Sequence, residues 1–280
     1  MRTRVLLPLV IVFALVSGAA WAVYRIRQGI DSLAATVHAA SLTRFEVGRE
    51  TRTFDLARAR SLTIDNHFGE VTVRPGGPDL RVEATTHARG EDLEDARRRA
   101  RGLRIVGRPD GRTGFRLTAG QSRSDPTAGV DLAVYLPPTL ALCVTVRAGR
   151  VAVHRIRGPV EVRADAGEVL LEDLSGPIAA HTRAGQLDLR RLTSSRVQAS
   201  VDVGEVNVDF ARPFSGRLDA SARAGQINIG LKPGSRCQVS TDASIGQVSD
   251  DLSPRLLYRS GPGRIRATVG IGEIRLSEAP

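Results

Sequence analysis

The feature that most constrains this chain is a short unit that recurs six times between residues 142 and 250. Each unit has a small or aliphatic residue, then glycine, then Glu, Gln or Arg, then another aliphatic residue. The glycines are Gly149, Gly167, Gly185, Gly204, Gly225 and Gly246, spaced 18, 18, 19, 21 and 21 residues apart. Looser copies of the unit surround Gly69 and Gly272. Spacings of this length indicate a repeat architecture.

On both sides of each glycine, apolar residues alternate with polar ones. Leu187 and Leu189 follow Gly185 at the second and fourth positions, and Ile178 and Ala180 precede it by seven and five. A period of two predicts short strands with one buried face, and the glycine marks the bend between them. Two short strands cannot bury their apolar face alone, so neighbouring units must stack. The sequence therefore predicts an all-β fold, a parallel β-solenoid with coils of 18–21 residues.

One outward-facing position, two residues before each glycine, carries charges of alternating sign. Its residues are Arg147, Asp165, Arg183, Asp202 and Arg223, followed by Ser244. In a parallel, in-register stack, equivalent residues of successive coils lie ~4.8 Å apart, so opposite charges become neighbours. Each exposed pair contributes only about 0–1 kcal/mol, so we expect this structural ladder to specify register more than stability.

The two cysteines test the predicted order of the coils. Cys143 and Cys237 belong to coils five repeats apart, which separates them by roughly 24 Å at ~4.8 Å per coil. A disulfide needs Cα atoms within about 7 Å of each other. The sequence therefore predicts two free thiols.

Residues 5–24 form an uncharged apolar run, VLLPLVIVFALVSGAAWAVY, with two arginines on each side. About 20 apolar residues at ~1.5 Å each span a ~30 Å hydrocarbon core, so the run is long enough for a transmembrane helix that places the chain in a lipid membrane. The alternative is a signal peptide cleaved after Ala22, because Ala20-Trp21-Ala22 fits the small-x-small pattern. The length of the run and the interfacial Trp21 and Tyr24 favour a retained anchor. Both interpretations put the main domain outside the cytoplasm, and the symmetric arginines leave the orientation open.

The chain divides into three predicted parts. Residues 1–27 are the anchor or signal segment, residues 28–48 are a stalk, and residues 49–280 are the β-solenoid domain. Within that domain, residues 91–101 place acids first and arginines last, as a solvated helix does. The last stretch, 252–280, is expected to form the closing coils, since a solenoid needs its ends covered.

The formal net charge of +10 first suggests a polyanionic partner. Half of it, +5, lies in residues 1–60, whereas the repeat region 142–250 has a net charge of only +2. Residues 91–101 hold four acids and no aromatic residue, which is unlike a nucleic-acid-binding helix. The sequence therefore predicts no nucleic acid partner.

The repeats AGRVAV, AGEVLL, AGQLDL, VGEVNV and AGQINI, together with LTIDNHFGEVTV and VDLAVYLPP, point to a known family. Over roughly residues 45–276, the chain resembles the bacterial β-strand-repeat domain family of unknown function that carries the label putative adhesin. The resemblance implies a β-solenoid fold and a location in the cell envelope. It supplies no catalytic residues.

A search for chemistry leaves no site. Asp165 and Asp202 lie on one face two coils apart, ~9.6 Å at ~4.8 Å per coil, near the upper separation for an inverting glycosidase. Arg183 between them favours both ionised forms, whereas a general acid needs a raised pKa. The histidines are scattered, and no His or Cys pair has metal-ligand spacing. We expect no catalytic residue, no metal and no cofactor.

Three functions remain open at this stage. The first is a membrane-anchored extracytoplasmic domain with an adhesin-like binding or scaffold role, whose partner is an unidentified protein or envelope polymer. The second is a regulatory or sensory partner of an envelope membrane system. The third is an enzyme that acts on cell-envelope polysaccharide, which would use Asp165.

Overall fold

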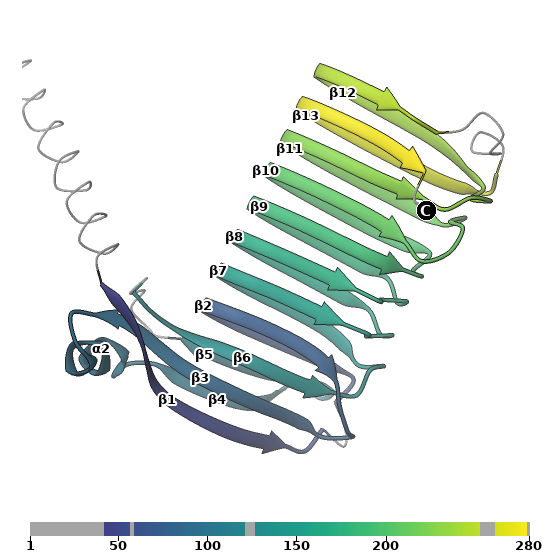
Figure 1. Ribbon diagram of the computed structural model, residues 1–280. Coiled ribbons are helices and arrows are strands. Elements are labelled where there is room, and N and C mark those ends of the chain that lie inside the picture. Colours follow the sequence, from purple (N-terminus) through teal and green to yellow (C-terminus); the bar gives the residue numbers. More distant parts are fainter. Residues whose placement is uncertain (1–41, 57–58, 121–126, 253–260, 279–280) are drawn as a thin grey trace, which may run out of the picture.

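The computed structural model describes residues 42–56, 59–120, 127–252 and 261–278. Within these residues the chain is nearly all β, as predicted: thirteen strands form one open sheet, paired mostly in parallel, and a single helix accompanies them (Figure 1). The elements are β1 (Thr43–Phe54), β2 (Ser61–Pro75), β3 (Leu80–Gly90), α2 (Leu93–Ala100), β4 (Arg104–Asp110), β5 (Gly114–Gly120), β6 (Ala128–Leu136), β7 (Ala141–His154), β8 (Val160–Glu172), β9 (Ile178–Leu192), β10 (Arg196–Phe210), β11 (Arg217–Leu231), β12 (Cys237–Asp250) and β13 (Gly263–Glu278). Their order in the sheet is β1-β3-β6-β2-β7-β8-β9-β10-β11-β13-β12, with β5 also paired to β2 and β4 to β5.

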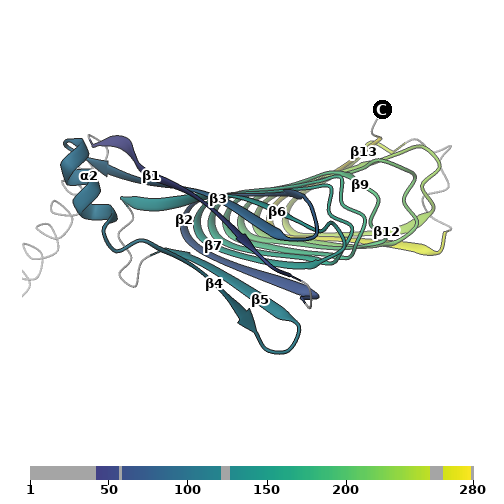
Figure 2. The ribbon, with the colours of Figure 1, turned by 90° about the horizontal axis from the view of Figure 1, so that it is seen from below.

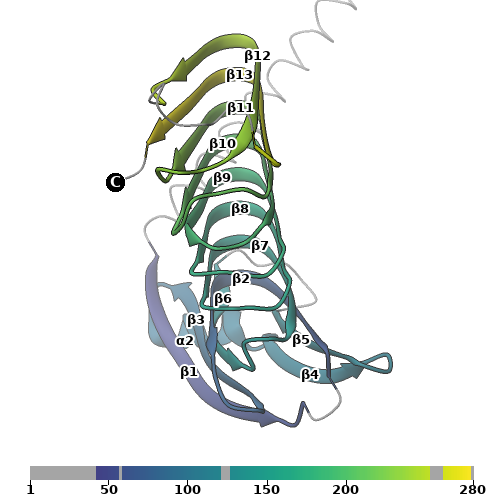
Figure 3. The ribbon, with the colours of Figure 1, turned by 90° about the vertical axis from the view of Figure 1, so that its right-hand side faces the viewer.

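The strands β2 and β7 to β13 form a solenoid-like stack of coils, which are nested behind one another in Figure 2 and stacked one above another in Figure 3. Alternate side chains point inward, and in β9 the residues Ile178, Ala180, Leu187 and Leu189 are at most 3 % exposed. Their equivalents in β8 and β10 are their Cα partners, so the apolar side chains form continuous buried columns. Full burial of a Leu or Ile contributes about 1.5–3 kcal/mol, which makes these columns the main source of stability.

The repeat glycines stack directly on one another through the whole series of coils. The six predicted glycines have φ between +132° and +145°, which residues with a Cβ rarely adopt. A Cβ at Gly185 would also overlap the carbonyl oxygen of Gly167 in the preceding coil, and Gly204 meets Gly185 in the same way. Backbone conformation and close approach therefore both require glycine at the bend.

Antiparallel strands close the base of the stack. β5 pairs with the first half of β2 and β6 with the second half, both in parallel, so together they form one split coil. β4 lies antiparallel to β5, β3 antiparallel to β6, and β1 antiparallel to β3. Charged side chains along β1 discourage further pairing at this edge. They are Arg44, Glu46, Arg49, Glu50 and Arg52.

The predicted helix over residues 91–101 is confirmed as α2. Asp92 caps it by accepting a hydrogen bond from the Asp95 N–H at 2.7 Å. Its buried residues Ala96 and Ala100 cluster with Ala88 of β3, while its arginines face outward. The helix therefore covers the base of the sheet.

Asp131 of β6 ties the strands of the base together. Its carboxylate lies 2.5 Å from the Arg44 guanidinium of β1 and 3.4 Å from His87 Nδ1 of β3, and it accepts a 2.8 Å hydrogen bond from the Glu70 N–H. Burial alone would raise the pKa of Asp131, but His87, the Glu70 N–H and Arg44 together lower it.

We expect this carboxylate to make the stability of the protein dependent on pH. Because the pKa of Asp131 is lower in the folded than in the unfolded state, its stabilisation is present above the unfolded value of about 3.9 and is lost as the pH falls below it. Urea unfolding should show that the native chain is more stable than the Asp131→Asn variant at pH 6, with the difference shrinking as the pH falls below about 4. A difference that stays constant with pH would contradict this assignment.

At the other end, the last strand of the chain is not the last strand of the stack. β13 lies between β11 and β12, in parallel with both (Figure 1). The predicted order, in which residues 252–280 close the stack beyond β12, is therefore wrong.

The inward side chains explain why β13 takes the interior place. At its five inward positions β13 carries only aliphatic residues, each at most 2 % exposed: Ile265, Ala267, Val269, Ile274 and Leu276. The paired positions of β12 include two polar residues: Val239, Thr241, Ala243, Val248 and Asp250. Placing β13 inside buries more apolar surface and leaves the Asp250 carboxylate in contact with water.

Both cysteines are free thiols, as predicted. The insertion of β13 puts six steps rather than five between β7 and β12, or ~29 Å at ~4.8 Å per step. Burial raises the pKa of Cys143, and it raises that of Cys237 to about 11. Both side chains are therefore protonated and weakly nucleophilic at neutral pH.

The predicted anchor or signal segment, and the stalk as far as residue 41, lie outside the described residues. Residues 43–48, which the sequence assigned to the stalk, belong to β1. None of the helices described is long and apolar enough to cross a membrane.

Candidate binding surface

The stack presents two exposed faces, one on each side of the glycine bend. The first face consists of the outward side chains that precede the glycine in each coil, and the second face of those that follow it. Because equivalent residues are in register from coil to coil, each outward position forms a straight row with ~4.8 Å between neighbours. Any ligand of these faces meets rows of side chains.

The predicted structural ladder lies on the first face, in adjacent coils. Arg183 lies 3.2 Å from Asp165, and Arg223 lies 3.4 Å from Asp202. Beyond Arg223 the next neighbour is Gly270 of β13 and not Ser244, because of the altered strand order. The two aspartates considered for glycoside hydrolysis thus each face an arginine.

Reversing both aspartate charges tests the role of this ladder. The Asp165→Arg/Asp202→Arg variant would place five arginines in one row, and we expect it to lower the free energy of unfolding by about 1–2 kcal/mol. The loss should shrink in high salt, which screens exposed charges. Urea unfolding at two salt concentrations measures both effects, with Asp165→Asn/Asp202→Asn as the milder control. Unchanged stability at low salt would show that the ladder does not specify register.

A second charge ladder, which the sequence analysis missed, lies at the turn six residues after the glycine. Arg155, Asp173 and Arg191 occupy it with φ between +51° and +57°. Arg191 binds both carboxylate oxygens of Asp173, at 2.9 and 2.7 Å. This hydrogen bonding lowers the pKa of Asp173 and raises that of Arg191. In the sequence, the alternating charges of these three residues, each six positions after its glycine, could have revealed this second ladder.

The second face carries a ladder of one carboxylate and two amide side chains. Asn207 Nδ2 donates to Asp188 Oδ1 at 2.8 Å, and Asn228 Nδ2 donates to Asn207 Oδ1 at 2.8 Å. All three residues stand three positions after their glycine. Because they satisfy one another, they stabilise the face and leave few free hydrogen-bonding groups for a ligand.

A shallow apolar hollow of about 320 Å³ opens on the first face across β7, β8 and β9. Its lining includes the small and proline side chains of Ala141, Pro159, Pro177 and Ala179, together with the polar or charged Ser61, Glu161, Arg196 and Gln198. The half-buried Cys143 also lines it, but its raised pKa makes the thiol a poor nucleophile. The hollow offers apolar contact rather than chemistry.

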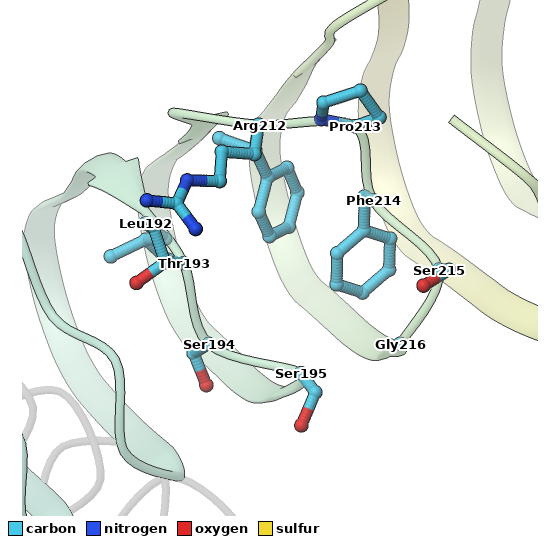
Figure 4. A pocket seen from close by; sticks show the side chains of 10 residues that line it. Leu192, Thr193, Ser194, Ser195, Arg212, Pro213, Phe214, Ser215 and Gly216 are labelled. Carbon is cyan, nitrogen blue, oxygen red and sulfur yellow. The ribbon is translucent and has the colours of Figure 1, made fainter. Parts of the chain in front are cut away.

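A turn pocket of about 140 Å³ lies between the turns that lead into β10 and β11 (Figure 4). Hydroxyl groups and one guanidinium line its mouth, from Thr193, Ser195, Ser215 and Arg212. Phe210 and Phe214 stack at 4.2 Å between ring centroids and are at most 4 % exposed, so they form the floor of the pocket and belong to the core. The turn pocket is polar where water reaches it.

Next to the turn pocket, the first face carries an arginine patch, defined as Arg196, Arg217, Arg264 and Arg266. Arg217 is the Cα partner of both Arg196 and Arg264, so three arginines occupy one row in successive coils. The sequence analysis did not single out these residues. Arg196, Arg217 and Arg264 each stand eight positions before the glycine of their coil, so aligning this position across the actual strand order reveals the row.

None of the described residues groups into a set of three or more metal-ligating side chains. His154 Nδ1 lies 2.9 Å from Glu172, and His181 Nδ1 lies 2.9 Å from the Ser200 hydroxyl. These histidines therefore take part in hydrogen bonds between neighbouring coils.

Fold and surface together define an all-β chain of stacked repeats with exposed polar faces. No family model matches the chain, and no curated protein matches it. Among solved structures it is similar to a putative cell adhesion protein from Clostridium sporogenes, with 10 % identity, a TM-score of 0.36, and coverage of 83 % of this chain and 99 % of that one. It is also similar to a putative adhesin from Bacteroides fragilis, with 13 % identity, a TM-score of 0.37, and coverage of 82 % and 97 %.

A putative lipid binding protein from Parabacteroides distasonis is similar too, with 14 % identity, a TM-score of 0.23, and coverage of 82 % and 96 %. The first two descriptions match the label of the family that the repeats resemble. With TM-scores this low, these similarities do not assign a function to the chain.

Proposed function

We propose that the chain is a membrane-anchored β-solenoid whose main domain lies outside the cytoplasm and has an adhesin-like binding or scaffold role rather than an enzymatic one. The observation that carries this proposal is the in-register stack with its two exposed faces. Parallel pairing fixes each outward row relative to the next, so the surface is preorganised for an extended partner.

The geometry suits a partner outside the membrane. β1, the first described strand, lies at the base of the stack, so the apolar segment at residues 5–24 joins the domain there. β12 and β13 lie at the opposite end, farthest from the base (Figure 1). The anchor would then hold the base at the membrane while the faces of the later coils remain accessible.

A pull-down from solubilised cell envelope tests the binding role. The full chain should capture an envelope component, and a chain without residues 1–41 should capture the same component, because the stack itself provides the surface. Cell fractionation with mass determination of the mature N-terminus tests the anchor. A mature chain beginning at Val23 would show that the apolar segment is a cleaved signal peptide and not an anchor.

One observation favours the second function, regulation of an envelope membrane system. β1 is the first described strand after the predicted anchor and stalk, and Arg44 ties it to Asp131 of β6, so a movement of the anchor that the stalk transmits would reach the sheet. If the captured component is a membrane protein and is lost when residues 1–41 are removed, the regulatory role replaces the adhesin-like one.

A further inference from the structure

The arginine patch departs from the charge pattern of the rest of the first face. In the structural ladder, arginines alternate with aspartates. In the patch, Arg196, Arg217 and Arg264 follow one another without an intervening acid. Like charges on directly opposed residues of neighbouring strands repel each other.

The described residues provide little internal compensation for these charges. Asp219 accepts a 2.7 Å hydrogen bond from Arg217 Nε. Among the residues that the structure describes, no carboxylate forms an ion pair with Arg196, Arg264 or Arg266, and all three side chains are exposed. The patch is therefore a concentration of positive charge that an external anion would neutralise.

The backbone under the patch is held firmly. The Arg217 N–H donates to the Ser195 carbonyl oxygen at 2.8 Å, and the Arg264 N–H donates to the Gly216 carbonyl oxygen at 2.7 Å. The side chains of the three arginines in the row thus extend from fixed Cα positions in one line, with ~4.8 Å between neighbours. A linear ligand with regularly spaced anionic groups matches such a row better than a single compact anion.

Apart from Asp219, which is the Cα partner of both Gln198 and Arg266, the neighbouring groups are neutral and polar. Gln198 of β10 and Gln238 and Ser240 of β12 are exposed on the same face. At the turn pocket, Ser195 and Ser215 add exposed hydroxyls beside the row. Amides and hydroxyls both donate and accept hydrogen bonds, as recognition of sugar hydroxyls requires.

Nucleic acid fits this surface less well. Single-strand binding uses exposed aromatic side chains as stacking platforms. The two aromatic residues described near the patch, Phe210 and Phe214, are buried against each other. Planar carboxylates, in contrast, pair bidentately with guanidinium groups.

From this arrangement we infer that the arginine patch binds an acidic polysaccharide, a linear chain of sugars with carboxylate groups. The uronate carboxylates would pair with Arg196, Arg264 and Arg266, and the sugar hydroxyls would meet the amides and hydroxyls beside them. This inference rests on the proposed binding function and specifies the chemical class of its ligand.

The test measures binding of polygalacturonate to the detergent-solubilised full chain by isothermal calorimetry. We expect saturable binding that weakens by about 10-fold or more in the Arg196→Gln/Arg264→Gln/Arg266→Gln variant, because charge-assisted hydrogen bonds are lost. The control variant, Arg150→Gln/Arg190→Gln/Arg275→Gln, removes the same charge from exposed arginines of the second face. It should retain binding within about twofold, since surface charge away from the contact has little effect. Circular dichroism checks that both variants keep their strands.

Four results would overturn the inference. Equal weakening in the two variants would mean that only net charge matters. If the chain binds single-stranded DNA with the same affinity, the patch binds any polyanion. If it binds neutral dextran with the same affinity, the arginines have no role in binding. If the full chain captures an envelope component but does not bind polygalacturonate, the ligand class is wrong and the binding function stands. If the full chain neither captures an envelope component nor binds polygalacturonate, the proposed binding function and this inference are both wrong.

Discussion

Replacing Gly185 with alanine is expected to lower the free energy of unfolding by about 3 kcal/mol or more. Gly185 lies in the middle of the stack with φ +136°, and a Cβ there would overlap the carbonyl oxygen of Gly167. The clash involves backbone on both sides, so no side-chain rotation relieves it. Relief requires β8 and β9 to move apart, which breaks the parallel hydrogen bonds between them.

Urea unfolding followed by circular dichroism measures this loss. Gly77→Ala is the matched control, because Gly77 lies in an exposed turn with no heavy atom near the position of a Cβ. It should change the stability by no more than about 0.5 kcal/mol. A loss in Gly185→Ala as small as in this control would show that the bend tolerates a Cβ, contrary to the stacking described above.

Replacing Val269 of β13 with aspartate should disrupt two strands at once. Val269 is fully buried, so the variant places a carboxylate in the core at a cost of several kcal/mol. β12 is paired only with β13 among the described strands, so the loss of β13 removes its support. Hydrogen exchange should show that residues 237–250 and 263–278 both lose protection.

The control lies at the same inward position in the end strand. Ala243 is the Cα partner of Val269 and is partly exposed. Ala243→Asp should therefore reduce protection in β12 alone. If Val269→Asp leaves β12 protected, β12 rests on another strand and the observed order is wrong.

The coil stack was predictable because two local signals agree in every repeat. Alternation around Gly185 specifies an inward and an outward face, and the glycine specifies where the strand bends. The free thiols followed from the same reasoning, since stacking in chain order separates Cys143 from Cys237 by five steps and the insertion of β13 adds one more. The local sequence pattern was sufficient to predict the stacking wherever each coil packs on the coil that precedes it in the chain.

The position of β13 could not be predicted from chain order, because the choice between two similar coils depends on what each would bury. The signal was nevertheless present in Thr241 and Asp250, which occupy inward positions that are aliphatic elsewhere in the stack. A comparison of inward positions, rather than of glycine motifs alone, would have placed β12 at the end.

The arginine patch was missed for a related reason. The repeat region 142–250 has a net charge of only +2, which gives no sign that its Arg196 and Arg217 belong to a row of like charges. Arg264 becomes a neighbour of Arg217 only after β13 is inserted, although 47 residues separate them in the chain. Long-range juxtapositions of this kind depend on the strand order.

The inserted strand also has a consequence for protein synthesis. Coils from β7 to β11 can each fold onto the coil made just before, so this part of the stack can grow while the chain emerges from the ribosome. β12 emerges next, before its partner β13 is available. The edge of β11 therefore receives its partner only after β13 has emerged, so the distal end of the stack is completed out of chain order.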